Sequence, residues 1–135
     1  MARRILIVDD EALVARSMQK TLLRAGYDVE KAHSCLQGLQ TFEAAQRAGQ
    51  PFDLALLDLN MPGFEGQAFA GAGLELLSRL IECCPGLPVV ILTAYDEVNK
   101  AREALTRGAR GFFVKGREQI LVDQVHSILL GKAAQ

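Results

Sequence analysis

Five short apolar runs constrain most strongly how this chain can fold. They occupy residues 5–8, 54–57, 89–92 and 112–114, and a weaker run surrounds residues 27–29. The strongest runs are nearly uninterrupted and rich in Ile, Val and Leu, which is typical of strands that are covered on both faces. We therefore predict a parallel sheet that is buried between two layers of helices.

Amphipathic stretches between these runs predict the helices. Ser34 and Gln37 have the spacing of a capping box at the start of the second helix, and Asp96 is placed to cap the fourth. Gly26 and Gly108 stand where helices commonly end. Four stripes of apolar residues recur at helical spacing: Val14, Met18, Leu22 and Ala25; Leu77, Leu80, Ile81 and Cys84; Val98, Ala101 and Leu105; Leu121, Val125, Ile128 and Leu129.

The alternation of runs and stripes predicts an α/β fold of five βα units, (βα)5, with right-handed crossovers in one sheet. We expect one domain over residues 1–131 and a short C-terminal tail over residues 132–135, with no output domain in this chain. Residues 60–73 contain four glycines and are interpreted as an extended loop that leads into the third helix.

Composition excludes several classes of function. The net charge is −1 with both signs interspersed, so nothing attracts the chain generally to nucleic acid or to an anionic membrane. No stretch approaches the roughly 18 apolar residues that span a bilayer, and we expect a cytoplasmic protein. The three cysteines and two histidines lack metal-ligand spacing, and the sequence has no glycine-rich nucleotide-binding motif.

Residues suited to phosphoryl chemistry stand at the carboxyl ends of the predicted strands. Asp9 and Asp10 end the first run, Asp58 the third, Thr93 the fourth and Lys115 the fifth. A doubly wound sheet binds its ligands at this edge. Two carboxylates about 4 Å apart repel by ~4 kcal/mol at an effective dielectric constant near 20, which favours a cation such as Mg²⁺. A carboxylate can attack phosphorus, while an ammonium group and a hydroxyl bind the phosphoryl oxygens.

Four motifs in these regions carry a resemblance to a known family. They are ILIVDDE at residues 5–11, LLDLNMPG at 56–63, VILTA at 90–94 and GARGFFVK at 108–115. In this order and spacing they resemble the bacterial two-component response-regulator receiver domain, like that of the chemotaxis Y protein. The resemblance implies a flavodoxin-like, doubly wound parallel sheet of five strands in the order 2-1-3-4-5.

The resemblance also implies roles for single residues. Asp58 would be the phosphoacceptor for a histidine kinase or a histidine phosphotransfer protein. Mg²⁺, with Mn²⁺ as a substitute, would bind the side chains of Asp10 and Asp58 and the backbone carbonyl of Asn60. Asp9 would bind the metal mainly through water, and Lys115 would pair with the phosphoryl group.

The implied output is a change in partner binding. Thr93 would move toward the phosphoryl group, and Phe112, three residues before the lysine, would turn inward. This switch would remodel the face formed by the fourth helix, the fifth strand and the fifth helix. The partner would be a downstream protein, an output domain outside this chain, or a second copy bound through that face. We expect a regulatory switch with slow autodephosphorylation rather than a metabolic enzyme.

The chain departs from the family pattern at several positions. Gly116 replaces the proline that usually follows the lysine, which puts the cis peptide bond common there in doubt. Residues 67–72 resemble an insertion. Asn60 and Tyr95 stand where side chains modulate the phosphoryl lifetime, and we hypothesise that the bulk of Tyr95 hinders attack by water and lengthens this lifetime.

Two other functions share some of these residues. Haloacid-dehalogenase-like phosphatases also use an aspartate nucleophile, but they need a second acid where this chain has Asn60. They need an acidic pair after the lysine too, and here only Glu118 and the isolated Asp123 follow. A receiver-like module that binds partners without phosphorylation commonly lacks one or more of the five site residues, whereas this chain retains the set.

Overall fold

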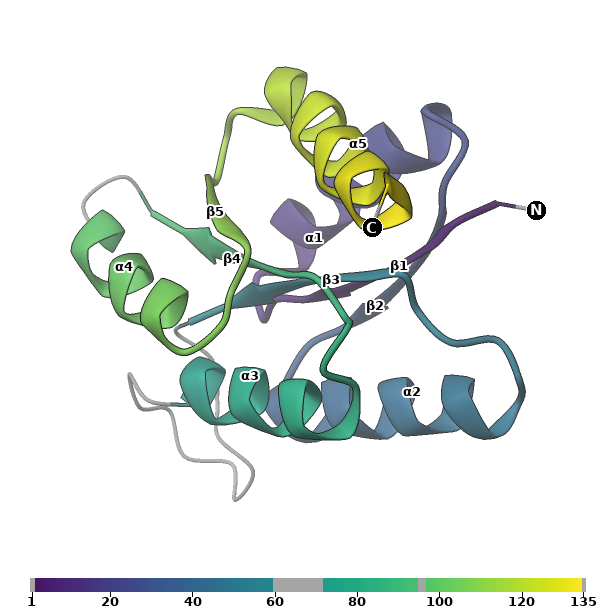
Figure 1. Ribbon diagram of the computed structural model, residues 1–135. Helices are drawn as coiled ribbons and strands as arrows, with labels where there is room; N and C mark the ends of the chain where they lie inside the picture. Colours follow the sequence, from purple (N-terminus) through teal and green to yellow (C-terminus); the bar gives the residue numbers. More distant parts are fainter. Residues whose placement is uncertain (1, 60–71, 95–96, 135) are drawn as a thin grey trace.

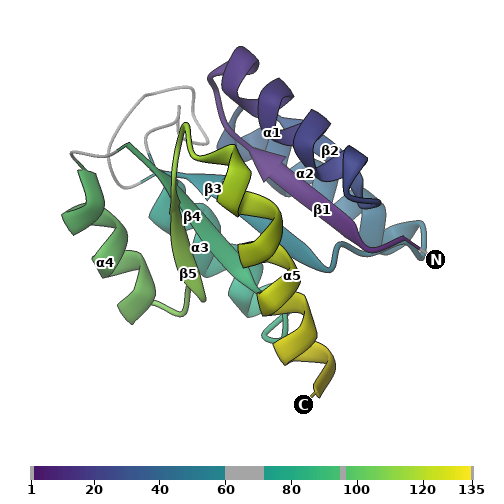
Figure 2. The ribbon, with the colours of Figure 1, turned by 90° about the horizontal axis from the view of Figure 1, so that it is seen from above.

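A single parallel sheet with helices on both faces forms this protein. The computed structural model describes residues 2–59, 72–94 and 97–134, and for Val98 and residues 132–134 it describes the backbone alone. The strand order β2-β1-β3-β4-β5 confirms the predicted flavodoxin-like arrangement (Figure 2). The strands are β1 (Arg4–Val8), β2 (Asp28–Ala32), β3 (Leu54–Asp58), β4 (Val89–Thr93) and β5 (Gly111–Val114).

Five helices enclose this sheet and divide its core into two layers. They are α1 (Ala12–Arg24), α2 (Cys35–Arg47), α3 (Ala72–Cys83), α4 (Val98–Thr106) and α5 (Glu118–Ala134). Helices α1 and α5 cover one face, while α2, α3 and α4 cover the other (Figure 1). Along β1, Ile5 and Ile7 pack toward the first pair, and Leu6 and Val8 pack toward the second group. Side chains therefore alternate between two buried layers, which explains the continuous apolar runs.

The predicted helical stripes are confirmed in part. Met18 and Leu22 are buried in α1, but Ala25 is exposed because it is the C-cap residue, where the helix ends. Among the side chains of α4 that the structure describes, Ala101 and Ala104 are buried, whereas Leu105, which we predicted to face the core, is 37% exposed. The predicted stripe uses i+4 spacing after Ala101, whereas the two buried alanines of this short helix have i+3 spacing.

The predicted cap of α2 at Ser34 is confirmed, but the reciprocal hydrogen bond of the expected capping box reaches His33 in place of Ser34. The Gln37 backbone N–H donates to Ser34 Oγ at 3.1 Å, and Gln37 Oε1 accepts from the His33 backbone N–H at 2.6 Å. The expected cap of α4, Asp96, lies outside the described residues, and the N-cap residue of that helix is Glu97. The glycines that we predicted after α1 and α4 have φ angles of 99° and 112°.

The start of α3 differs from the prediction. The helix begins at Ala72, so Ala72 and Gly73 are helical rather than part of a loop over residues 60–73. A Cβ atom on Gly73 would lie 2.5 Å from the carbonyl oxygen of Asp58 and 2.6 Å from Cα of Leu59. The Gly73 backbone N–H donates to the Leu59 carbonyl at 3.3 Å. A glycine is therefore required where α3 crosses the chain just after β3.

Helix α5 extends through Ala134, into residues 132–135 that we expected to form a tail. The peptide bond between Lys115 and Gly116 is trans, as the glycine suggested. No helix in the described part of the chain is both long and apolar enough to cross a membrane.

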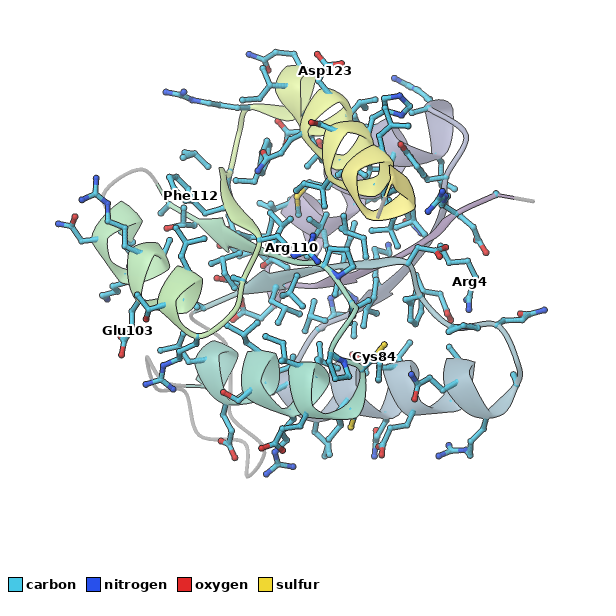
Figure 3. All side chains as sticks on the ribbon, in the orientation of Figure 1. Arg4, Cys84, Glu103, Arg110, Phe112 and Asp123 are labelled. Atoms are coloured by element: carbon cyan, nitrogen blue, oxygen red, sulfur yellow. The ribbon has the colours of Figure 1, made fainter. Side chains whose placement is uncertain are left out.

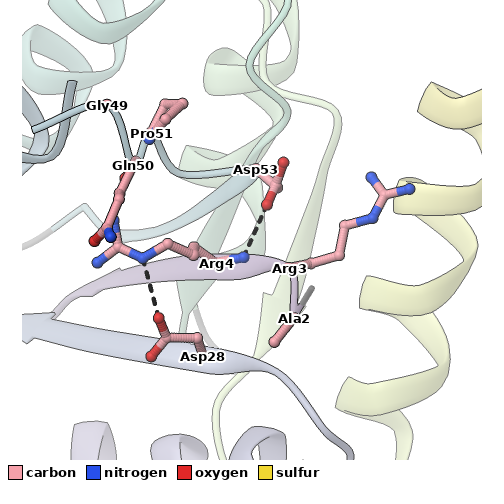
Figure 4. A pocket seen from close by; sticks show the side chains of 8 residues that line it. All are labelled: Ala2, Arg3, Arg4, Asp28, Gly49, Gln50, Pro51 and Asp53. Atoms are coloured by element: carbon pink, nitrogen blue, oxygen red, sulfur yellow. Dashed lines mark hydrogen bonds and ion pairs between the residues drawn. The ribbon is translucent and has the colours of Figure 1, made fainter.

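Arg4 organises the amino-terminal edge of the sheet, away from the strand ends that carry the predicted site. Its Nε donates to Asp28 Oδ2 at 3.1 Å, and its backbone N–H donates to Asp53 Oδ2 at 2.8 Å (Figure 4). The guanidinium also donates to the Gln50 carbonyl and lies 4.5 Å from the ring centroid of Phe52. These contacts join β1 to β2 and to the segment before β3.

Substitution of Gly73 by alanine tests the close approach of α3 to β3. We expect Gly73→Ala to lower the free energy of unfolding by about 1–3 kcal/mol, because the added methyl group has no space beside the Asp58 carbonyl. Gly86→Ala is the matched control, since a Cβ there would meet no atom within 4 Å. Urea unfolding measures both variants, and equal stability of the two would contradict the crowding.

Candidate functional site

The carboxyl edge of the sheet brings the predicted site residues together. Asp58 and Thr93 are the last residues of β3 and β4, while Asp9 and Lys115 directly follow β1 and β5. The sheet places β1 between β2 and β3, so the chain leaves β1 on one side and returns on the other. This reversal opens the edge beside β1 and β3, where doubly wound sheets bind their ligands.

Lys115 connects the acidic residues of this edge. Its Nζ lies 2.9 Å from Asp58 Oδ2, 3.1 Å from Asp9 Oδ2 and 2.8 Å from Glu11 Oε1. Burial alone would lower the pKa of the ammonium, but hydrogen bonds to Glu11 and Asp58 and the charges of Asp58 and Asp9 outweigh it. The pKa of Lys115 is therefore raised, and its side chain is a permanent cation at the centre of the site.

Four carboxyl groups surround this one ammonium. Asp9, Asp10, Glu11 and Asp58 each offer an oxygen, and these oxygens lie within 4.8 Å of one another. Asp9 and Asp58 are buried, whereas Asp10 and Glu11 are exposed. The pKa of Asp10 is raised, first by partial burial and then by the negative charge of Asp58. One lysine therefore leaves negative charge in excess at this edge.

Asp9 is fixed in the loop between β1 and α1. Its Oδ1 accepts from the Glu11 backbone N–H at 2.9 Å, and its own N–H donates to the Ala32 carbonyl at 3.0 Å. Its Oδ2 is near Lys115 but makes no hydrogen bond, and it is the one such buried side-chain atom in the described part of the chain. An all-oxygen donor set with an unsatisfied buried oxygen fits a hard divalent cation such as Mg²⁺.

Thr93 is buried beside this cluster. Its hydroxyl donates to the Ala94 carbonyl at 3.1 Å, and its own carbonyl accepts from the Lys115 N–H at 2.9 Å. The hydroxyl thus has a weak local partner, and the backbone bond keeps the ends of β4 and β5 in register.

Phe112 lies on β5, two residues earlier than the end of the strand. Its ring is partly buried and packs against the core layer that contains Ala101 and Ala104 of α4. Its carbonyl accepts from Gln124 Nε2 of α5 at 2.9 Å. Figure 3 shows Phe112 near α4, with Glu103 and Asp123 pointing outward from α4 and α5. The residue therefore contacts the elements expected to form the output face.

The prediction was incomplete for this site. Asn60 and Tyr95 lie outside the described residues, as do residues 67–71 of the expected insertion. Glu11 was part of a motif but received no role, although it makes the shortest contact to Lys115. Its position directly after two aspartates was the available signal. The structural role of Gly73 was missed as well. The sequence does not indicate which of the four glycines in this region lies against the backbone of another segment.

Comparisons with known proteins agree with this geometry. The chain is 32% identical over 133 residues to the response regulator protein FleR of Pseudomonas aeruginosa. The aligned region covers 98% of this chain and 26% of FleR. It is 37% identical over 111 residues to YkoG, an uncharacterized transcriptional regulatory protein of Bacillus subtilis. This aligned region covers 82% of this chain and 43% of YkoG. The chain thus spans less than half the length of these two relatives.

Solved structures show the same likeness. A CheY-like response regulator receiver domain protein from Methanospirillum hungatei has a TM-score of 0.83 at 27% identity, covering 99% of this chain and 98% of that one. NtrX from Brucella abortus has a TM-score of 0.84 at 25% identity, covering 99% of this chain and 28% of NtrX. The family model for the response regulator receiver domain matches residues 5–126. This chain therefore belongs to the response regulator receiver domain family of two-component signalling.

Proposed function

We propose that Asp58 accepts a phosphoryl group and that its phosphorylation switches the binding of a partner. The observation that carries this proposal is the position of Asp58 Oδ2, which lies 2.9 Å from the Lys115 ammonium among the clustered acids. A buried carboxylate at a strand end, with a fixed cation beside it, is suited to attack phosphorus and to have the new negative charge neutralised.

The donor in this proposal is the phosphohistidine of a histidine kinase or a histidine phosphotransfer protein. A carboxylate oxygen of Asp58 attacks phosphorus, so that a P–O bond forms while the P–N bond breaks. The imidazole nitrogen leaves with the electron pair and takes up a proton. Lys115 donates to the transferred phosphoryl oxygens, and the Thr93 hydroxyl reaches them once it leaves the Ala94 carbonyl.

Asp9, Asp10 and Asp58 are the described residues that would hold Mg²⁺, or Mn²⁺ in its place. The backbone carbonyl of Asn60 is the further ligand that we infer, and Asp9 would act mainly through water. The ion, when bound, neutralises charge on the phosphoryl oxygens. The unsatisfied Asp9 Oδ2 and the excess of carboxyl groups support this assignment.

Loss of the phosphoryl group completes the proposed cycle. Water attacks phosphorus, the P–O bond to Asp58 breaks, and inorganic phosphate and the carboxylate are regenerated. We infer that Asn60 and the bulk of Tyr95 set the rate of this step. A slow return makes the protein a regulatory switch and not an enzyme of metabolism, and we place the cycle in the cytoplasm.

The proposed output passes through Thr93 and Phe112. When Thr93 turns toward the phosphoryl group, the partly buried Phe112 ring moves inward against the layer that includes α4. The face formed by α4, β5 and α5 then changes its affinity for a downstream protein, for an output domain of a longer regulator, or for a second copy. The relatives that extend well beyond the matched region support a partner domain.

Acetyl phosphate tests the phosphoacceptor directly. In the presence of Mg²⁺ we expect intact mass spectrometry to show the gain of one phosphoryl group by the wild-type protein. Asp58→Asn should gain none, because the amide is not a nucleophile toward phosphorus. The control is Asp123→Asn, which removes an exposed carboxylate on α5 and should leave the mass gain unchanged. Phosphorylation of Asp58→Asn would show that another residue is the acceptor.

Thermal unfolding tests the charge balance of the acidic edge. Mg²⁺ should raise the melting temperature, because the ion binds the folded state. Asp10→Asn should stabilise the metal-free protein by up to about 1 kcal/mol, since it removes one of the repelling charges at a partly exposed position. In the same variant, Mg²⁺ should raise the melting temperature much less than it does in the wild-type protein. If Asp10→Asn and Asp123→Asn behave alike, the proposed metal site is wrong.

A further inference from the structure

Glu11 makes a contact with Lys115 that the proposed function leaves unexplained. Its Oε1 accepts from Lys115 Nζ at 2.8 Å, although 104 residues separate the two in the sequence. Glu11 is also the N-cap residue of α1, yet its side chain makes no capping hydrogen bond. The carboxylate instead links the loop after β1 to the loop after β5.

Two features of the backbone hold the loops that carry Glu11 and Lys115. Buried Asp9 accepts from the Glu11 N–H at 2.9 Å, which fixes the direction in which Glu11 leaves the loop. On the other side, the chain turns at Gly116 with φ of 94°, a conformation available to glycine but rare for other residues. The chain therefore turns directly after Lys115, whose ammonium donates to Glu11 and Asp58.

Three carboxylates already surround the ammonium of Lys115 in this arrangement. Its Nζ donates hydrogen bonds to Glu11 and Asp58 and forms an ion pair with Asp9 at 3.1 Å. A phosphoryl group on Asp58 therefore meets a lysine whose charge these carboxylates already neutralise, and it competes with them for the ammonium. Asp9 is fully buried, whereas the Glu11 side chain is 58% exposed and can be hydrated readily after it separates from the lysine.

We propose that Glu11 is a positioning residue that competes with the phosphoryl group for Lys115. In the unphosphorylated protein it holds the lysine in place, and the phosphoryl group displaces it from the ammonium. Its presence thereby weakens the binding of phosphoryl-like anions to the site. This inference rests on the proposed role of Asp58 as phosphoacceptor.

Beryllofluoride, an anion that mimics a phosphoryl group on aspartate, is the probe for the test. Titration calorimetry in the presence of Mg²⁺ should show binding to the wild-type protein and none to Asp58→Asn, which tests the proposed function by itself. Glu11→Gln should bind beryllofluoride roughly two- to fivefold more tightly, the range expected from loss of an exposed ion pair. Glu43→Gln, which removes an exposed glutamate on α2, should match the wild type.

Two further variants separate direct contact from a general effect of charge. Glu11→Asp retains the charge but shortens the side chain by one methylene, so it should bind beryllofluoride as tightly as Glu11→Gln. In a Lys115→Met background, Glu11→Gln should change the affinity much less than in the wild-type background. Urea unfolding confirms that each variant is folded before its affinity is compared.

Each contrary result has a distinct meaning. If the wild-type protein does not bind beryllofluoride, the proposed function of Asp58 fails. If it binds but Glu11→Gln has an unchanged or weaker affinity, the competition is overturned and the phosphoacceptor stands. If Glu11→Asp binds beryllofluoride like the wild type, Glu11 acts through its negative charge and not through direct contact with Lys115. If Glu11→Gln weakens Mg²⁺ binding as Asp10→Asn does, Glu11 is a metal ligand instead.

Discussion

One partly buried ammonium among several carboxyl groups determines the character of this site. Lys115, which follows β5, contacts Asp9 and Glu11 after β1 and Asp58 at the end of β3. Such a cluster is stable only while its charges are balanced, because like charges at these distances repel strongly. The remainder of the fold supplies a rigid frame: two buried layers hold the strands so that their carboxyl ends meet at one edge.

Much of this frame could be predicted because it follows from local pattern. Apolar runs without alternation indicate strands buried on both faces, and Asp9, Asp58, Thr93 and Lys115 were predicted to meet because parallel strands end at the same edge. The Ser34 cap was equally local, since its signal lies within four residues. Predictions of this kind depend on spacing along the chain and need no knowledge of which side chains finally touch.

The features that escaped prediction depend on contacts between distant segments. Glu11 belongs to the first motif but has no role predicted from the sequence, and only the folded arrangement brings it to Lys115. Gly73 was assigned to a loop because glycine disfavours helices, but the crossing of α3 over Asp58 and Leu59 requires it. The helical stripe predicted Leu105 on the buried face of α4, whereas the folded arrangement buries Ala104 and leaves Leu105 37% exposed.

The buried surface of α4 has a mechanical consequence. Among the residues of α4 whose side chains the structure describes, the fully buried Ala101 and Ala104 contribute methyl groups, while the larger Leu105 is 37% exposed. A contact made of small side chains lacks the deep interdigitation that locks leucine-rich helices into one register. Over these residues, translation or tilting along the sheet would thus disturb little packing, so this part of α4 has a shallower energy surface than a helix segment anchored by large side chains.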